Sequence, residues 1–139
     1  MTRRSLLGLG LAAAMLCAGV ACEKTDAPTD PVWGKQACAH CGMLVGERRY
    51  AAQAAVAGER KYFDDIGCMI LFMEERKVRP DHTWVHAGDA WLDAAAARYA
   101  NDAKTPMDFG LEARAPGSAG TGLGWDEARA QVLAKGRGR

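Results

Sequence analysis

Residues 50–63 show an apolar stretch, a turn and a second apolar stretch. Residues 50–57 are mostly small and apolar, and Gly58-Glu59 has the composition of a turn. Apolar character resumes over residues 61–63, which include Tyr62 and Phe63. Two such runs on either side of a glycine-containing turn predict a β-hairpin.

The hydrophobic pattern takes a helical period after residue 63. Asp64 or Asp65 can serve as the N-cap, because a carboxylate oxygen accepts a hydrogen bond from the first turn of a helix. Pro80 prevents continuation, so the helix is expected to end near Lys77. Between the cap and Lys77, apolar residues occupy positions i, i+3, i+4 and i+7, which indicates an amphipathic helix. These positions are Ile66, Met69, Ile70 and Met73.

The second half repeats this order more loosely. Asp89 is the expected cap of an alanine-rich helix, and Pro116 is expected to end a strand because proline has no N–H for a ladder. The predicted elements are a strand at 83–85, a helix at 90–100, a strand at 109–115, a loop at 117–124 and a helix at 125–134. A basic tail from about Lys135 is expected to be disordered. The whole pattern predicts an α+β fold with two ββα-like units in series.

The first residues have the features of an export signal. Arg3-Arg4 precedes the apolar stretch 6–20, which is too short to span a bilayer and fits a signal peptide over residues 1–21. The paired arginines resemble a twin-arginine signal or form a plain basic n-region. Small residues before Cys22 resemble a lipobox, in which that cysteine carries lipid; the alternative is cleavage near residue 21 and a free periplasmic protein. Residues 22–36 are expected to form a flexible tether to a domain at 37–139.

Composition narrows the class of protein. The 139 residues are 49% hydrophobic and 25% charged, as in globular proteins, and the formal net charge of +1 gives no reason to expect nucleic acid as a partner. Of five cysteines, Cys17 would leave with the signal and Cys22 would carry lipid. Three thiols then remain, at Cys38, Cys41 and Cys68. An odd number fits a disulfide framework poorly, so at least one thiol is free or is held by a metal.

The segment Cys38-Ala-His40-Cys41-Gly-Met43 carries the sharpest chemical signal. Two thiols three positions apart can bind a soft ion, form a redox disulfide, or build a structural clamp or zinc knuckle. Met43 adds a thioether and His40 an imidazole. Thiolate with thioether is the ligand set that selects Cu(I), whereas zinc has no use for methionine.

Two further sulfurs are candidates. Cys68 falls in the first turn of the predicted helix, where the macrodipole favours a thiolate; otherwise it is a buried core cysteine. Met107 follows Pro106, which stiffens its loop and suits a thioether ligand, although a lone methionine in a loop usually serves packing. No nucleophile–base motif or phosphate-binding glycine loop is present in the sequence, so an enzyme is not expected.

Four motifs in order resemble the nitrous oxide reductase accessory proteins of the NosL family. They are C-x-x-C-G-M from Cys38, F-D-D-I-G-C-M from Phe63, W-L-D-A-A-A-A-R-Y from Trp91 and T-P-M from Thr105. The resemblance implies two ββα units akin to an organomercurial lyase domain. It also implies a lipoprotein on the periplasmic side of a bacterial membrane, which binds Cu(I) and delivers copper for assembly of the copper centres of nitrous oxide reductase. The expected partners are that enzyme and copper-centre assembly proteins.

Motif and resemblance together give a set of expected ligands. Cys38, Cys41 and Met43 are the main expected copper ligands, His40 and Met107 are auxiliaries, and Cys68 is a further candidate. Two other functions stay open: a periplasmic thiol-disulfide oxidoreductase that uses Cys38 and Cys41, and a structural zinc module. Metal analysis of the protein, purified without oxygen, distinguishes these three.

Overall fold

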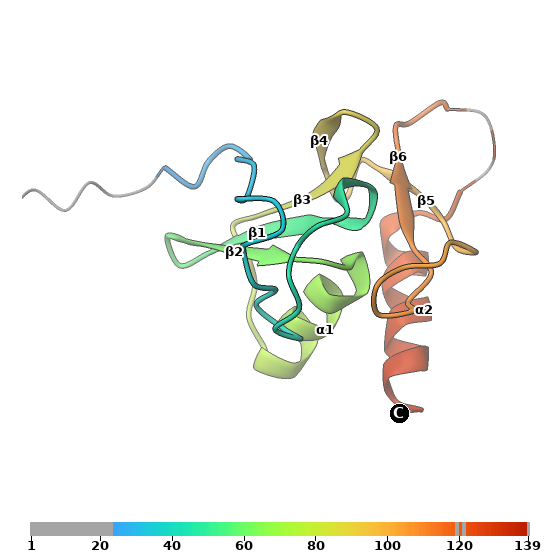
Figure 1. Ribbon diagram of the computed structural model, residues 1–139. Helices are drawn as coiled ribbons and strands as arrows, with labels where there is room; N and C mark the ends of the chain where they lie inside the picture. The colour runs from blue at the N-terminus through green and yellow to red at the C-terminus, as the bar shows by residue number, and fades with distance from the viewer. Residues whose placement is uncertain (1–23, 119, 121, 139) are drawn as a thin grey trace, which may run out of the picture.

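A computed structural model describes residues 24–118, 120 and 122–138 (Figure 1). The signal peptide and Cys22 lie outside the described residues, so the expectations about export and lipid stay predictions. In chain order the elements are η1 (Arg48–Tyr50), β1 (Ala52–Val56), β2 (Glu59–Phe63), α1 (Ile66–Arg76), β3 (His82–Ala87), β4 (Ala90–Asp93), β5 (Arg98–Ala100), β6 (Glu112–Arg114) and α2 (Trp125–Gly136).

Four antiparallel strands form the larger sheet, in the order β2-β1-β3-β4. Its register pairs Ala52 with both Phe63 and Val85, so these three residues lie in one row across β2, β1 and β3. The strands β5 and β6 form a separate two-stranded sheet beside α2 (Figure 1). No helix among the described residues is long and apolar enough to cross a membrane.

The predicted hairpin and first helix are confirmed. The turn lies one position earlier than expected, at Ala57-Gly58, where both residues have positive φ (50° and 78°), as the tight turns of twisted hairpins require. Asp65 is the N-cap of α1, and its Oδ1 accepts from the N–H of Gly67 at 2.8 Å. Lys77 ends the helix in the left-handed conformation.

The predicted helix over 90–100 is wrong, because this segment forms β4, a turn and β5. β4 pairs with β3, which places Trp91 opposite His86 with ring centroids 4.9 Å apart. Asp93 accepts from the N–H of Ala95 at 2.8 Å and so begins a tight turn. Cross-strand packing of a large aromatic side chain outweighs the high helix propensity of alanine here, because propensity is a weaker determinant than tertiary contacts.

Smaller differences concern the end of the chain. The strand predicted at 109–115 is shorter and comprises only Glu112–Arg114. The last helix begins at Trp125 as predicted and continues to Gly136, so Lys135 is helical where a disordered tail was expected. Its ammonium group also contacts the carbonyl oxygens of Asp108 and Phe109, both at 3.3 Å.

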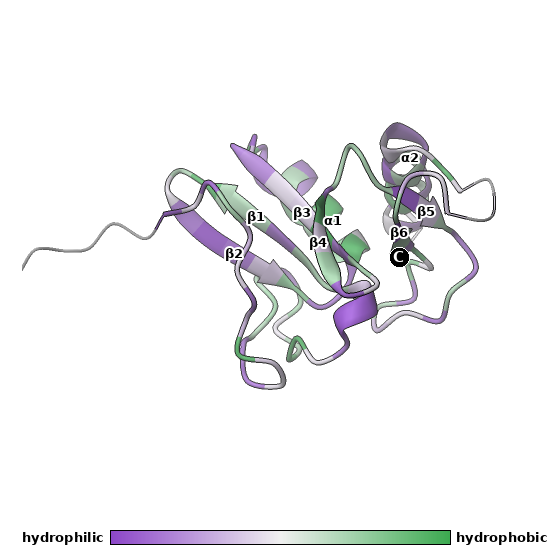
Figure 2. Ribbon diagram, turned by 90° about the horizontal axis from the view of Figure 1, so that it is seen from above, coloured by the Kyte–Doolittle hydropathy of each residue, from purple (hydrophilic) through white to green (hydrophobic). Residues whose placement is uncertain are grey.

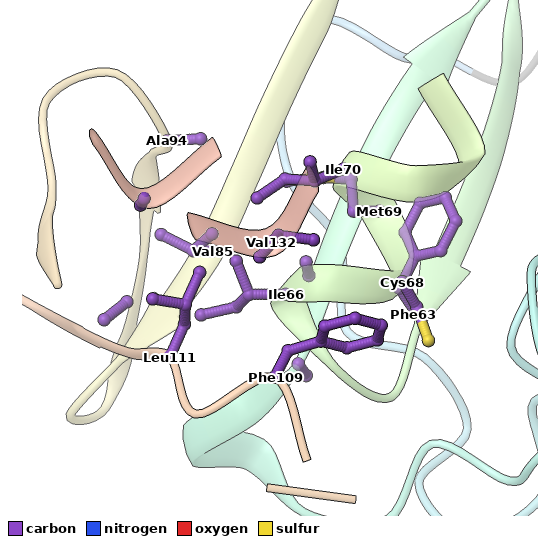
Figure 3. Packing of buried hydrophobic residues seen from close by; sticks show 14 of the residues in the cluster. Phe63, Ile66, Cys68, Met69, Ile70, Val85, Ala94, Phe109, Leu111 and Val132 are labelled. Atoms are coloured by element: carbon purple, nitrogen blue, oxygen red, sulfur yellow. The ribbon is translucent and has the colours of Figure 1, made fainter. Parts of the chain in front are cut away.

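The α+β class and the two ββα units are confirmed. The order β1-β2-α1 forms the first unit and β5-β6-α2 the second, while the hairpin β3–β4 extends the sheet of the first. Side chains of both units meet in one core, in which Ile66 and Ile70 of α1 lie near Val132 of α2 (Figure 3). Figure 2 shows that α1 is mostly hydrophobic whereas β2 is mostly hydrophilic.

Residues 24–33, which we call the N-terminal strap, cross the face of the sheet opposite α1. The amide of Gln53, which is fully buried, bonds both the N–H and the carbonyl oxygen of Thr29 (3.2 and 3.1 Å). Arg60 donates to the carbonyl oxygens of Lys24 and Ala27 at 3.1 and 2.7 Å. The expectation of a mobile tether is therefore wrong for this stretch, because buried polar groups of the sheet need the strap as their hydrogen-bond partner.

Candidate metal centre

Four side chains converge near the start of α1, and we call them the thiol pocket: Cys38, Cys41, Asp64 and Cys68. One ligand atom from each lies within 4.8 Å of all the others. Three segments supply them, namely the loop before η1, the junction between β2 and α1, and the first turn of α1. The group has the size and the donor types that hold one metal ion.

The loop that carries Cys38 and Cys41 is a narrow, hydrogen-bonded turn. The N–H of Cys38 donates to the carbonyl of Met43 at 2.7 Å, and the N–H of Gly42 donates to the carbonyl of Cys38 at 3.0 Å. Gly42 has φ 78°, a conformation that glycine adopts without strain. The N–H of Ala39 donates to the carbonyl of Tyr62 at 2.8 Å, which fastens the turn to the end of β2. The two thiols are therefore positioned by backbone bonds before any metal binds.

The two consecutive aspartates at the start of α1 have different roles. Asp65 caps the helix, and this leaves Asp64 free to face the sulfurs. Asp64 is 1% exposed, and its Oδ1 accepts from Cys41 Sγ at 3.2 Å. Its Oδ2 is buried and has no hydrogen-bond partner among the described residues. A buried carboxylate oxygen without a partner is costly, so the pocket favours a cation.

Hydrogen bonds within the pocket separate the thiol pKa values. The thiol of Cys68 donates to Cys38 and lowers the pKa of Cys38 to about 6. Burial raises the pKa of Cys41 to about 12, and the same Cys68–Cys38 bond raises the pKa of Cys68. Within the pocket, these shifts favour the thiolate form at Cys38 and the protonated form at Cys41 and Cys68.

Access to the pocket differs among the sulfurs. Cys38 and Cys68 are 4% and 0% exposed, whereas Cys41 is half-buried. Figure 3 shows the sulfur of Cys68 directed away from the apolar cluster around Ile66 and Val132. Cys41 is therefore the sulfur that an entering ion meets first and that a departing ion leaves last.

The structure brings together the three predicted cysteines, with Asp64 as a member that sequence reasoning missed. A signal for it existed, since only one of two adjacent acids can cap a helix. His40 does not join the group, because its Nε2 lies 3.1 Å from Glu75 Oε2. The side chain of Met43 is exposed on the loop, and Met107 is half-buried with its N–H bonded to Asp65. Whether these residues bind metal stays a prediction.

Comparison with known proteins finds a similar fold in one solved structure and no similar sequence. No protein-family model matches the sequence, and no curated protein sequence matches it. The crystal structure of the copper chaperone NosL from Shewanella denitrificans aligns with a TM-score of 0.57, at 14% sequence identity, over 77% of this chain and 87% of that chain. At this identity the likeness concerns the fold. The described chain therefore has a NosL-like fold, with a cysteine-rich pocket suited to a metal ion.

Proposed function

We propose that this protein binds one Cu(I) ion in the thiol pocket and passes it to another protein, as a copper chaperone. The observation that carries this proposal is the convergence of Cys38, Cys41 and Cys68 within 4.8 Å at the start of α1. Three sulfur ligands in a mostly buried pocket suit a soft monovalent ion. The fold shared with a NosL copper chaperone supports the same conclusion.

The charges of the pocket fit a cation that must later leave. The Cys38 thiolate and the unpartnered Asp64 oxygen attract Cu(I) even while the other two thiols are protonated. Cys41, whose pKa is raised, must lose its proton before it binds. Protons therefore compete with copper at the most accessible sulfur, which favours ligand exchange there.

The destination of the copper follows from the resemblance of the sequence motifs. We propose delivery to the copper centres of nitrous oxide reductase, together with their assembly proteins, on the periplasmic side of a bacterial membrane. Lipid on Cys22 would hold the protein there. Substitution of Cys22→Ala should move the protein from the membrane fraction to the soluble fraction, and continued retention at the membrane would exclude this anchor.

Zinc is the second candidate metal, because Asp64 completes a set of four ligands. Three thiolates and one carboxylate oxygen fit the tetrahedral coordination that zinc prefers. Copper and zinc give different outcomes in the same experiment, since zinc would lie in a four-ligand shell that includes oxygen.

The test is metal loading of the purified protein under anaerobic conditions. We expect one copper per chain, retained against dialysis, and an X-ray absorption spectrum of Cu(I) with a sulfur-dominated shell. Cys38→Ser should abolish retention, and His82→Asn, at an exposed position on β3, should leave it unchanged. Retention of zinc in place of copper, or a shell of only nitrogen and oxygen, would contradict the proposal.

A thiol oxidoreductase is tested on the same material. Cys38 has the lowered pKa of a reactive thiol, but it lies in a loop before β1 and not at the start of a helix that follows a strand. We expect the metal-free protein to show no insulin reduction above background. Turnover that Cys38→Ser removes would favour the enzyme.

A further inference from the structure

The connection between β5 and β6 reaches across to the first turn of α1. We call residues 105–109 the TPM loop. The N–H of Met107 donates to Asp65 Oδ2 at 2.9 Å, and the hydroxyl of Thr105 also bonds the Asp65 carboxylate. The same Thr105 oxygen accepts from the N–H of Gly110 at 3.2 Å. Two bonds from one loop thus end on a single carboxylate.

Asp65 also fixes the helix that carries a pocket thiol. Its Oδ1 accepts from the N–H of Gly67, one residue before Cys68. Phe109 lies directly against Gly67, where no side chain would fit. The second ββα unit therefore contacts the first beside the thiol pocket, and Asp65 joins the two.

Helix capping alone does not account for an aspartate here. Asn and Ser cap helices about as well as Asp, and they carry no charge. Asp65 is 0% exposed, and burial of a carboxylate costs free energy unless both oxygens are well bonded. What aspartate offers over these residues is a second acceptor oxygen, and the TPM loop is what uses it.

We propose, on the basis of the copper-binding function above, that Asp65 is a positioning residue that holds the TPM loop against the first turn of α1, next to the helix residue Cys68 of the thiol pocket. Asp65 touches no metal. It sets the place of Met107 relative to Cys68 before copper arrives, so that copper binds without first ordering a loop. Lys135 of α2 supports the loop from the other side through the carbonyl oxygens of Asp108 and Phe109. Partners that orient ligands in this way contribute strongly to metal affinity.

The first measurement needs no metal. Asp65→Ser keeps one oxygen for the helix cap and cannot reach the loop. Asp65→Asn has the same shape as the native residue but lacks one acceptor oxygen. We expect amide hydrogen exchange at Met107 to accelerate at least about tenfold in Asp65→Ser, while Cys68 stays protected. In Asp65→Asn, faster exchange at Met107 shows that the bond to the loop is lost, and faster exchange at Gly67 shows that the cap bond is lost. Unchanged exchange at Met107 in Asp65→Ser would overturn the positioning role of Asp65.

The second measurement uses the copper-loaded protein. We expect Asp65→Ser to lose Cu(I) to a chromogenic chelator about tenfold faster than the native protein, since loss of a residue that orients a metal ligand costs about 10- to 100-fold in metal affinity. X-ray absorption should report the same altered shell as in Met107→Leu, and the double variant should add nothing. Asp93→Asn is the matched control, because Asp93 also begins a turn. It should change neither the rate of Cu(I) loss nor the X-ray absorption spectrum.

The outcomes separate the two proposals. If the native protein retains Cu(I) and Asp65→Ser releases it at the native rate with an unaltered shell, the positioning role is wrong and the copper function stands. If the native protein retains no Cu(I), the proposed function falls and the positioning role falls with it, whatever the amide exchange shows.

Discussion

In the first ββα unit, β1 and β2 are joined by a two-residue turn, whereas β5 and β6 of the second unit are separated by residues 101–111. The helices differ as well. α1 buries six residues, including Cys68, while α2 buries only Ala128 and Val132. The first unit is tightly built around its helix, and the second extends a long connection onto the start of that helix.

This difference assigns separate tasks to the units. The thiol-pocket residues precede or belong to the first unit, and the second unit contributes the TPM loop and the supporting Lys135. Under the proposed function, one half of this repeated arrangement binds the metal and the other half supports the site. Changes in the first unit should affect metal binding most, and equivalent changes in the second should affect it less.

The largest expected effect is on copper affinity in Cys68→Ser. Loss of a buried sulfur ligand should weaken Cu(I) binding more than about a hundredfold, which corresponds to about 3 kcal/mol. Met107→Leu in the second unit should weaken it about tenfold or less, because a thioether is an auxiliary, uncharged donor. Competition with a chromogenic Cu(I) chelator measures both. Equal losses in the two variants would contradict the division of tasks.

A second comparison uses one glycine from each helix. An alanine Cβ at Gly67 would lie 2.5 Å from Phe109 Cβ and against its ring, so Gly67→Ala should destabilise the protein by about 1–3 kcal/mol through overpacking. At Gly136 the Cβ meets only the end of the Leu71 side chain at 2.9 Å, which can rotate. Gly136→Ala should be neutral or slightly stabilising, because alanine favours helix by about 1 kcal/mol. Chemical unfolding gives both values.

Phe109→Leu provides the control for this clash. Combined with Gly67→Ala, it should recover part of the lost free energy of unfolding, because the smaller side chain makes room for the new methyl group. A double variant that is less stable than the sum of the single changes would show that the loss has another cause.

The same comparison explains which parts of the structure the sequence could predict. The first hairpin and α1 depend on local signals, namely a turn at Gly58, a cap at Asp65 and a helical period, and these were recognised. β4 depends on pairing with β3, which the alanine-rich sequence around Trp91 does not display. The strap escaped prediction for a similar reason, because its partners Gln53 and Arg60 lie more than 20 residues away.

The residues of the thiol pocket, like the elements of the fold, could be predicted only in part from the sequence. Cys38 and Cys41 share a motif, and Cys68 was singled out by its place in a helical first turn. Asp64 required knowledge of which acid caps the helix, and the pairing of His40 with Glu75 required the position of α1 beside the loop. Local chemistry is visible in sequence, whereas the choice among nearby candidates is made by tertiary contacts.

A smaller effect is expected from the strap, which covers the sheet of the first unit. Gln53→Leu removes both bonds to Thr29 and should lower the free energy of unfolding by about 1–2 kcal/mol. Amide exchange at Thr29 should accelerate more than exchange in α1. Gln131→Leu in α2, which loses only a 3.4 Å contact with Asn101, is the control and should change little. Undiminished protection of Thr29 would show that other contacts hold the strap.

The smallest expected effect is a pH dependence from the hairpin that joins the two units. His86 is buried, with its ring nearly perpendicular to the stacked rings of Trp33 and Trp91, and burial lowers its pKa. Arg48 lowers the pKa further, while Asp30 and Asp89 oppose the shift. Below the ordinary histidine pKa of about 6.5 the unfolded chain takes up a proton that the folded chain refuses, so stability from this group is complete above that pH.

We therefore expect the free energy of unfolding to fall as the pH drops from about 7 until His86 also titrates in the folded protein. His86→Phe keeps an aromatic ring packed against both tryptophans but cannot take up a proton, so its stability should depend less on pH over this range. His82→Phe, an exposed position on the same strand, should keep the native slope. Urea unfolding at a series of pH values measures all three. A native slope in His86→Phe would assign the pH dependence to groups other than His86.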